Sequence, residues 1–322
     1  AESRGALSAV AALADRTGAK LAWIPRRAGE RGALAAGAIG NLLPGGRPVV
    51  DAPARVDIAA AWGVDSLPTA VGRSSSEIFA AVNAGEIDAL VVGGVDPLDS
   101  ENHHAALIAL KQAFVVSLEI RPSAITQLAD VLLPVAAVSE KSGSFLNWEG
   151  RARSFETAVA DSLQRCDLRI LSMLADEMGR PIELATVKAA AQELAALGLW
   201  DGAHANFAPV SSAAPQSVSG NEALLTSWLR LLDDGSLQEG EENLAGTARK
   251  PVVVISPKRA SALGVVDGDT IRVSNSHGAI VLPVLVEAIH DDAVWLPRNS
   301  RGSHLLATFG VASGALVTVV KD

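Results

Sequence analysis

The sequence predicts an α/β protein whose parallel sheet is covered by helices, followed by a separate small β-barrel. Over residues 1–135 short apolar runs alternate with helical patterns, the arrangement of right-handed βαβ units. From residue 251 the apolar period becomes two, which is typical of strands. A chain of 322 residues can bury two or more cores. We expect an α/β body over 1–200 (divisible into 1–135 and 136–200), a linker with one helix over 201–250 and the barrel over 251–322.

The elements of the first half follow from caps and apolar runs. A helix over 2–17 ends at Gly18, a residue that tolerates the left-handed backbone of a helix end. Ser74 and Glu77 form a capping box at the start of a second helix. Ser100 and Ser123 are placed to cap two further helices. The strands expected between these helices are 21–25, the buried run 87–94, 113–120 and 130–135.

The second half divides into a helical part and a strand part. Helices are expected over 167–179 and 186–198, each closed by a glycine. Residues 220–235 are apolar nearly all round and predict a buried helix, and 238–250 form an acidic surface linker. In the last part, AIVLPVLV is apolar on both alternating faces, which favours a closed barrel over a half-exposed sheet. The other barrel elements are strands VVVIS, DTIRVSN, AVWLP and ALVTVV, a hairpin turn at 275–278 and a short helix at 256–264.

Composition excludes several classes of function. A net charge of −9 and an aromatic content of 4% without tyrosine argue against nucleic-acid binding. No apolar run approaches the ~20 residues that cross a bilayer, so we expect no direct membrane insertion. The single cysteine, Cys166, cannot build a disulfide framework or by itself hold an iron–sulfur cluster. We interpret it as a packed thiol on a helix face.

Several motifs together resemble the molybdopterin-oxidoreductase superfamily. They are ADVLLP followed by EKSGSFLNWEGR, and SPKRASALGVVDGDTIRVSNSHGAIVLPVLV. The resemblance implies a Rossmann-like molybdopterin-oxidoreductase body and a C-terminal six-stranded double-psi barrel of the molybdopterin-dinucleotide-binding type. Two upstream runs, LAWIPRRAGERGALAAGAIGNLLPGGRPV and AGEIDALVVGGVDPLD, are similar to the family of large peripheral-arm subunits (the G subunits) of proton-pumping NADH-quinone oxidoreductase, respiratory complex I, in its actinobacterial form.

This resemblance carries expectations about cofactors and partners. The proteins of this family are longer, and their N-terminal part carries iron–sulfur clusters, so this chain corresponds to the C-terminal portion. That portion is not thought to carry molybdenum. We therefore expect no cofactor in this segment, other peripheral-arm subunits as partners, and a place on the cytoplasmic side of the plasma membrane. The first residue is not methionine, so position 1 is a suspected cut point within a longer protein.

Two stretches are candidates for a remnant of the pterin site. In cofactor-binding relatives the turn corresponding to Gly93, Gly94 and Asp96 lines the nucleotide, and glycines at the end of a parallel strand let a ligand approach closely. A tight turn that needs a positive φ is the competing interpretation, and the GxGxxG spacing of a dinucleotide site is absent.

The second stretch is the loop with Lys141, Asn147, Glu149 and Arg151, which in molybdenum-binding relatives closes beside the cofactor. Here we favour a folding role, with Glu149 paired to Arg151 and a buried Trp148. Asn299, in the barrel, is the last candidate on the resemblance.

Other polar clusters give weaker indications. Arg26, Arg27 and Arg31 form either a solvated basic face or a contact with acidic groups of a neighbouring subunit. Gly45 and Gly46 lack the Lys-Ser/Thr ending of a phosphate loop and predict a plain Pro-Gly turn. His103 and His104 are adjacent, and residues 277, 290 and 304 are histidines far from one another in sequence. The chain has no HExxH, CxxC or GxSxG motif, so no metal ligand or catalytic residue is assigned.

The interpretation we favour is a non-redox structural portion of the electron-transferring peripheral arm. The alternative is the tail of an enzyme that uses a molybdopterin guanine dinucleotide, of the formate-dehydrogenase type. In that case Gly93–Pro97, the EKSGSFLNWEGR loop and the segment 299–303 would hold the dinucleotide. A third, weaker interpretation is an independent binding module of this fold.

Overall fold

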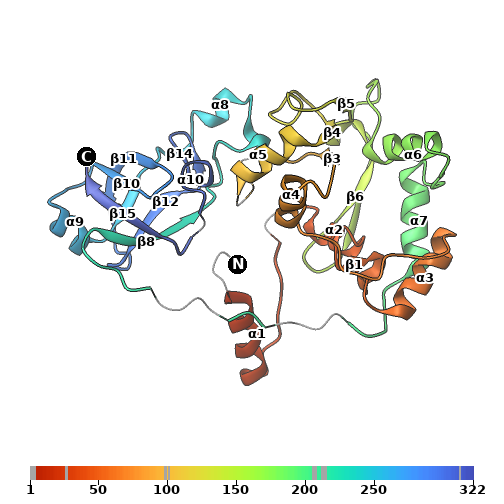
Figure 1. The fold of residues 1–322 in the computed structure, drawn as a ribbon, viewed down its shortest axis with the longest axis horizontal. Helices are drawn as coiled ribbons and strands as arrows, with labels where there is room; N and C mark the ends of the chain where they lie inside the picture. The colour runs from red at the N-terminus through yellow and green to blue at the C-terminus, as the bar shows by residue number, and fades with distance from the viewer. Residues whose placement is uncertain are drawn as a thin grey trace. The chain divides into compact units, whose positions relative to one another are not determined.

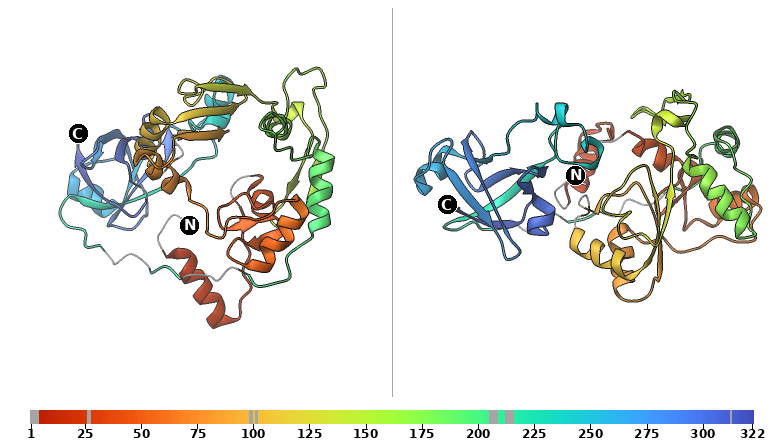
Figure 2. Two further views of the ribbon diagram at one scale, coloured as in Figure 1. Left: turned by 45° about the vertical axis from the view of Figure 1, so that its right-hand side comes forward. Right: turned by 90° about the horizontal axis from the view of Figure 1, so that it is seen from above.

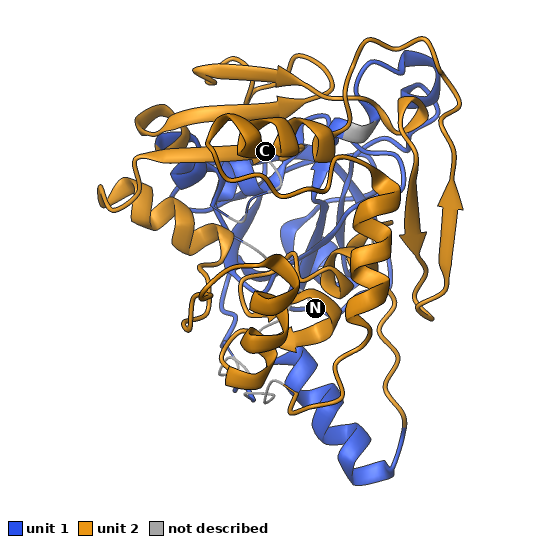
Figure 3. Cartoon of the chain, turned by 90° about the vertical axis from the view of Figure 1, so that its right-hand side faces the viewer, with its two compact units in different colours: residues 1–19, 96–108, 209–322 blue, residues 20–95, 109–208 orange. Residues whose placement is uncertain are grey.

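The computed structural model describes residues 5–25, 28–97, 100, 102–204, 209–211, 216–311 and 313–322. The chain divides into two compact units, one of residues 1–19, 96–108 and 209–322 and the other of residues 20–95 and 109–208 (Figure 3). The predicted boundaries at residues 200 and 250 stay a prediction. The first helix, α1 (Ala6–Thr17), is confirmed and ends at Gly18 with a φ of 70°.

A parallel three-stranded sheet forms the centre of one unit (Figure 1). Its order is β3 (Ala89–Gly93), β4 (Phe114–Glu119) and β5 (Val131–Pro134), with both pairings parallel, which confirms the expected α/β class. In Figures 1 and 2 the helices α4 (Ser75–Asn83) and α5 (His103–Gln112) lie along this sheet. The apolar core between them contains Val82, Leu110 and Val115.

Local caps explain where these helices begin. The capping box of α4 is confirmed, since the Ser74 amide donates to the Glu77 carboxylate at 2.7 Å and the Ser74 hydroxyl accepts from the Glu77 amide. The Ser74 hydroxyl also donates to the Glu77 carboxylate at 2.7 Å, and this bond, followed by the bond from the Ser74 amide, holds the pKa of Glu77 below its usual value. At α5 the side chain of Asn102 accepts a bond from the amide of Ala105 at 3.0 Å, and the expected cap at Ser100 stays a prediction.

Three expectations for this unit are wrong. Residues 21–25 form no strand, and Leu21 and Ile24 are exposed, because an apolar run becomes a strand only where a partner strand satisfies its backbone. Residues 124–128 form turns instead of a helix, stabilised by the short mutual bonds of Ser123 and Thr126. Strand β3 is not buried, because its alternate residues are left exposed on one face of the sheet.

The rest of this unit is a set of short helices beside a hairpin. Helices α6 (Asp167–Glu177) and α7 (Val187–Leu197) confirm the two predicted helices. Cys166 immediately precedes α6 and is half-buried, so it does not lie on the helix face as expected. The remaining elements are α2 (Glu30–Ala35), β1 (Leu42–Leu43), η1 (Pro44–Gly46), β2 (Arg47–Pro48), α3 (Ala52–Trp62), η3 (Val138–Glu140), β6 (Gly143–Leu146) and β7 (Ala152–Phe155).

A buried guanidinium joins the Pro-Gly turn to α7. Gly45 and Gly46 have φ values of 77° and 82°, which confirms the plain turn. Arg47 follows this turn with its side chain only 5% exposed. It donates to the carbonyls of Pro44, Leu197 and Gly198 at 2.9 to 3.1 Å and pairs with Asp57 at 3.2 Å. It therefore satisfies carbonyls that the C-terminus of α7 leaves without a helical partner.

The other unit contains a closed six-stranded barrel, which confirms the predicted barrel class. The strand order is β10 (Thr270–Ser274), β11 (Ala279–Val286), β9 (Val253–Ile255), β12 (Ala293–Pro297), β8 (Glu222–Trp228) and β15 (Leu316–Lys321). Asn275 and Gly278 close the hairpin between β10 and β11 as expected. The remaining elements are η4 (Ser236–Gln238), α8 (Glu242–Ala245), α9 (Pro257–Leu263), β13 (Asn299–Ser300), β14 (Ser303–His304) and α10 (Leu305–Phe309).

The expected helix over 220–235 is wrong, because residues 222–228 are strand β8 of the barrel. Ala223, Leu225 and Ser227 point into the core and are at most 6% exposed. Leu224 and Thr226, between them, are partly covered, so this short run does not alternate clearly between a buried and an exposed face. A run of this kind does not distinguish a buried helix from a buried strand, and pairing with β12 and β15 decides for the strand.

Candidate functional site

The glycine turn after β3 is used for packing against β4. Gly94 has a φ of 59°, and its amide donates to the carbonyl of Leu118 at 3.2 Å. A Cβ added at Gly93 would lie 3.7 Å from the Cβ of Leu118, an ordinary contact. Asp96, two residues after Gly94, is half-buried. The geometry therefore accounts for Gly94 as a tight-turn residue with a positive φ.

The run Asn147–Arg151 is the turn of the hairpin between β6 and β7. The side-chain oxygen of Asn147 accepts from the amides of Glu149 at 3.1 Å and Arg151 at 2.8 Å. The Glu149 carboxylate pairs with the Arg151 guanidinium at 3.0 Å, as expected. Trp148 is 48% exposed, so its predicted burial is wrong. Trp148 lies in the turn of a two-stranded ribbon, where strand pairing satisfies the backbone but does not cover the faces of an indole.

Lys141 is tied to α6. Its ammonium group lies 2.6 Å from the carboxylate of Asp167, in the first turn of that helix. The neighbouring Glu140 accepts from the amide of Ala137 at 2.7 Å. A carboxylate in the first turn of a helix is favoured by the helix dipole, and the ammonium group adds a second favourable charge. Lys141 thus joins the segment after β5 to α6.

Asn299 belongs to a polar network on the barrel. The strands β8 and β12 are parallel neighbours, so the loops that follow them leave the barrel at the same end. The carbonyl of Asn299 accepts from the amide of Asp234 at 2.8 Å, and its side-chain oxygen lies 2.9 Å from Nδ1 of His304. Nε2 of His304 lies 3.2 Å from the carboxylate of Asp234. Asn299 is only 7% exposed.

Sequence reasoning missed Asp234 and His304 as partners of Asn299. Asp234 lies 65 residues before Asn299, in the loop after β8, and that strand had been expected to be a helix. Only pairing of β8 with β12 brings the two loops together. The spacing of Asn299 and His304, across the short pair of β13 and β14, was the one signal available.

An aromatic and guanidinium cluster near this network also escaped prediction. The rings of Trp228 and Trp295 lie 4.7 Å apart, and the Arg230 guanidinium lies 5.2 Å from the Trp295 ring centre. Burial, followed by the nearby charge of Arg249, lowers the pKa of Arg230. Arg230 donates to the carbonyls of Arg249 and Lys250, so it holds the segment before β9.

The candidate residues of the loop after β5 bond to other residues of this chain. Lys141 pairs with Asp167, Asn147 accepts two backbone bonds, and Glu149 pairs with Arg151, while Asn299 belongs to the other unit. No group of three or more His, Cys, Asp or Glu side chains in the described ranges could hold a metal ion.

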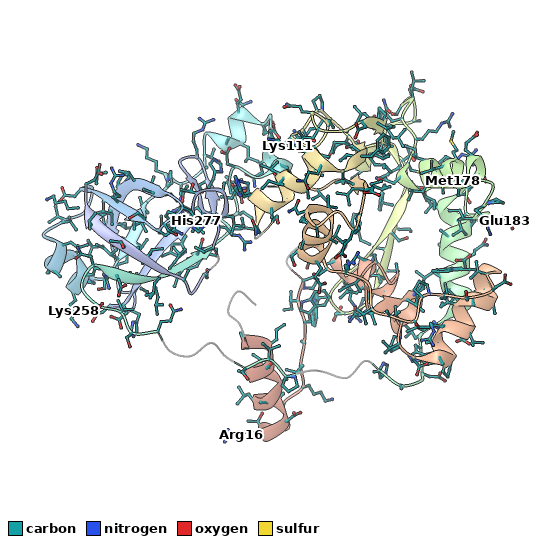
Figure 4. All side chains as sticks on the ribbon, in the orientation of Figure 1. Arg16, Lys111, Met178, Glu183, Lys258 and His277 are labelled. Atoms are coloured by element: carbon teal, nitrogen blue, oxygen red, sulfur yellow. The ribbon has the colours of Figure 1, made fainter. Side chains whose placement is uncertain are left out.

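The remaining predicted residues lie apart from these sites. Arg26 and Arg27 lie outside the described residues. Arg31, in α2, is near the hairpin turn, since its Nη2 lies 4.0 Å from the place a Cβ would take on Gly150. His277 lies in the turn between β10 and β11, away from Lys258 on α9 (Figure 4). Within the described part of the chain, no helix has both the length and the apolar character needed to cross a membrane.

Two family models match this chain. The model of the molybdopterin oxidoreductase family matches residues 3–177. The model described as "Molydopterin dinucleotide binding domain" matches residues 235–320, which include most of the barrel strands and Asn299. The two matches follow one another along the chain in the order that the sequence motifs predict.

Curated relatives match over nearly the whole chain. The G subunit of NADH-quinone oxidoreductase from Mycobacterium tuberculosis (strain CDC 1551 / Oshkosh) is 50% identical over 98% of this chain and 40% of its own length. The protein of the same name from Streptomyces coelicolor (strain ATCC BAA-471 / A3(2) / M145) is 46% identical over 98% of this chain and 38% of its own. The chain therefore spans about two fifths of the length of these relatives.

A solved structure supports the fold. Acetylene hydratase from Pelobacter acetylenicus superposes with a TM-score of 0.55 over 83% of this chain and 49% of its own. The sequence identity is 16%, so this likeness concerns the fold alone.

Proposed function

Since this chain belongs to the molybdopterin oxidoreductase family, we propose that it is a non-redox structural portion of the G subunit of NADH-quinone oxidoreductase. The observation that carries the proposal is the 50% identity with the mycobacterial G subunit over 98% of the chain. In this role the chain supports the peripheral arm, and electrons pass through iron–sulfur clusters in another part of the longer polypeptide. Its location is then peripheral, on the cytoplasmic side of the membrane.

The local geometry supports a structural role for the old cofactor segments. We propose that Gly93, Gly94, Asp96, Lys141, Asn147, Glu149, Arg151 and Asn299 are remnants of a pterin site. Asn147 organises a turn and Lys141 holds α6, and both tasks persist without a ligand. A side chain kept for cofactor binding alone would be expected to leave polar atoms free for that cofactor.

Partner contact is proposed for the basic residues near the hairpin. Arg31 lies beside the exposed turn that carries Trp148 and Arg151. Exposed aromatic and arginine side chains are enriched where proteins bind one another. We propose that this face contacts another protein of the peripheral arm.

Purification of the full-length protein from its native host tests the proposal. An affinity tag should recover the other subunits of NADH-quinone oxidoreductase in fixed ratio, as identified by mass spectrometry. Recovery of the tagged protein without any of these subunits would overturn the assignment.

Metal analysis of the same preparation distinguishes the structural proposal from the alternative, a cofactor-binding enzyme. A tail of a molybdopterin guanine dinucleotide enzyme is supported by the dinucleotide-binding family model over residues 235–320. That enzyme should contain about one molybdenum per chain together with a bound pterin, because the metal is held through the cofactor. The structural proposal expects iron without stoichiometric molybdenum.

A further inference from the structure

The two faces of the parallel sheet differ in how they are covered. Leu90, Val92 and Val115 share one face, and the core formed with α4 and α5 lies against it. The strand register places the alternating residues on the opposite face, which we call the bare face. It consists of Ala89, Val91 and Gly93 of β3, Phe114, Val116 and Leu118 of β4, and Val131 and Leu133 of β5.

The bare face is apolar at every position and yet largely exposed. Val91 is 61% exposed, Phe114 51% and Val131 37%, whereas Leu118, near the C-terminal end of β4, is buried. A sheet face that meets water normally carries polar side chains at these alternating positions. None of the eight residues is polar or charged, so the composition is that of an interior face.

Among the described residues, the apolar core against this sheet lies on one face only. The helices that contribute to this core, α4 and α5, do so on the covered face. In α/β folds the crossovers place helices on both faces of a parallel sheet, which is why such strands read as continuous apolar runs. The sequences of β3 and β4 are such apolar runs, and this pattern indicates a layer of helices on the bare face as well.

We propose that the bare face is covered by amphipathic helices from the part of the longer polypeptide that lies outside these 322 residues. This inference rests on the proposed function, because the mycobacterial and Streptomyces relatives have most of their length outside the region matched by this chain. That length is ample for a helical layer, since two helices of average size need only about 25 residues plus a connection.

The chemistry of the face favours this occupant over a separate protein. Contacts between separately folded proteins usually combine an apolar centre with a polar rim and arginine anchors. The bare face offers no charge and no hydrogen-bonding side chain. It matches the stripe of a helix that is packed within one domain.

Thiol accessibility in the full-length protein tests this proposal. Val91→Cys is made in a Cys166→Ser background, with any other exposed cysteine of the full-length chain replaced. Leu163→Cys, at a position that is 96% exposed, is the matched control. We expect maleimide to label Val91→Cys at least about tenfold more slowly than Leu163→Cys, because labelling then requires local opening. Equal rates would overturn the proposal.

A photo-crosslinker at position 91 identifies the occupant. Mass spectrometry should find the cross-link within the same polypeptide, outside residues 1–322 of this chain. A cross-link to a different protein, or to a second copy, would also overturn the proposal. Both measurements are made on the full-length protein before assembly, so failure to recover partner proteins bears on the proposed function and leaves this test intact.

Discussion

The barrel and the three-stranded sheet bury their strands in different ways. In the barrel, strands pair in a closed ring, and eighteen buried apolar residues of the described part of the chain form one core. In the sheet, a smaller core of six buried described residues lies on one face, and the bare face lies opposite. Closure removes edges and gives every inward side chain a partner, whereas an open sheet depends on added layers. The barrel therefore encloses its core within a ring of strands, whereas the core of the sheet lies on one face only.

The largest expected effect is in the barrel core. Phe309→Ala removes a fully buried ring from α10 and should lower the free energy of unfolding by about 3–5 kcal/mol. Val91→Ala, on the bare face, should change the stability of the isolated 322-residue chain by about 0.5 kcal/mol or less. Urea unfolding, monitored by hydrogen exchange of peptides from each region, measures the change in stability of both variants. An equal loss of unfolding free energy in the Val91 and Phe309 variants would contradict the difference in burial between the two regions.

The second effect concerns a buried polar contact outside the barrel. Arg47→Ala leaves the carbonyls of Pro44, Leu197 and Gly198 without their donor, and should cost about 1–3 kcal/mol. Faster hydrogen exchange at the C-terminal end of α7 is the specific readout. Arg73→Ala is the control, because its ion pair with Glu86 is about half exposed and should contribute about 1 kcal/mol or less. Unchanged exchange in α7 would contradict the role given to Arg47.

The third prediction compares neighbours in the hairpin turn. Asn147→Ala removes an acceptor of two backbone bonds and should cost about 1 kcal/mol. Trp148→Ala should change stability by about 0.5 kcal/mol or less, because the ring is half exposed. Thermal unfolding of the two variants decides the order. A larger loss for the tryptophan variant would mean that the indole is covered in the isolated chain.

The smallest effect is a pH dependence at α4. The pKa of Glu77 is lowered in the folded chain. Its ionised carboxylate therefore stabilises the fold at a pH above the ordinary glutamate pKa, and this stabilisation is lost as pH falls through the folded pKa. Glu77→Gln should therefore reduce the loss of stability between about pH 5 and pH 3. Melting temperatures across this interval provide the measurement, with the exposed Glu183→Gln as control. Identical acid profiles for the wild type and Glu77→Gln would count against the capping-box assignment.

Much of the fold was predictable where the signal is local. The capping box at Ser74, the glycine after α1 and the hairpin at Asn275 each depend on a few adjacent residues, and all three are confirmed. The predictions failed where a distant partner decides. Strand β8 needs β12 and β15, and residues 21–25 would need a neighbouring strand to pair with.

In the candidate site, too, contacts between neighbouring residues were predictable and contacts between separate elements were not. The pairing of Glu149 with Arg151 was predictable, because two residues of one turn meet whatever the rest of the chain does. The contact of Lys141 with Asp167 and the network of Asp234, Asn299 and His304 join residues from separate elements. The exposure of Trp148 was equally hidden, since burial depends on what lies across from a side chain.

The sequence by itself determined the class of each region, the positions of its helix caps and turns, and the family to which the chain belongs. Only the tertiary structure decided that β8 is a strand, that Arg47 closes the end of α7, and that one face of the parallel sheet is bare. The physical reason is the separation in sequence between the residues that interact. Caps and turns are satisfied within a few residues, whereas strand pairing and burial are set by segments far apart in the chain.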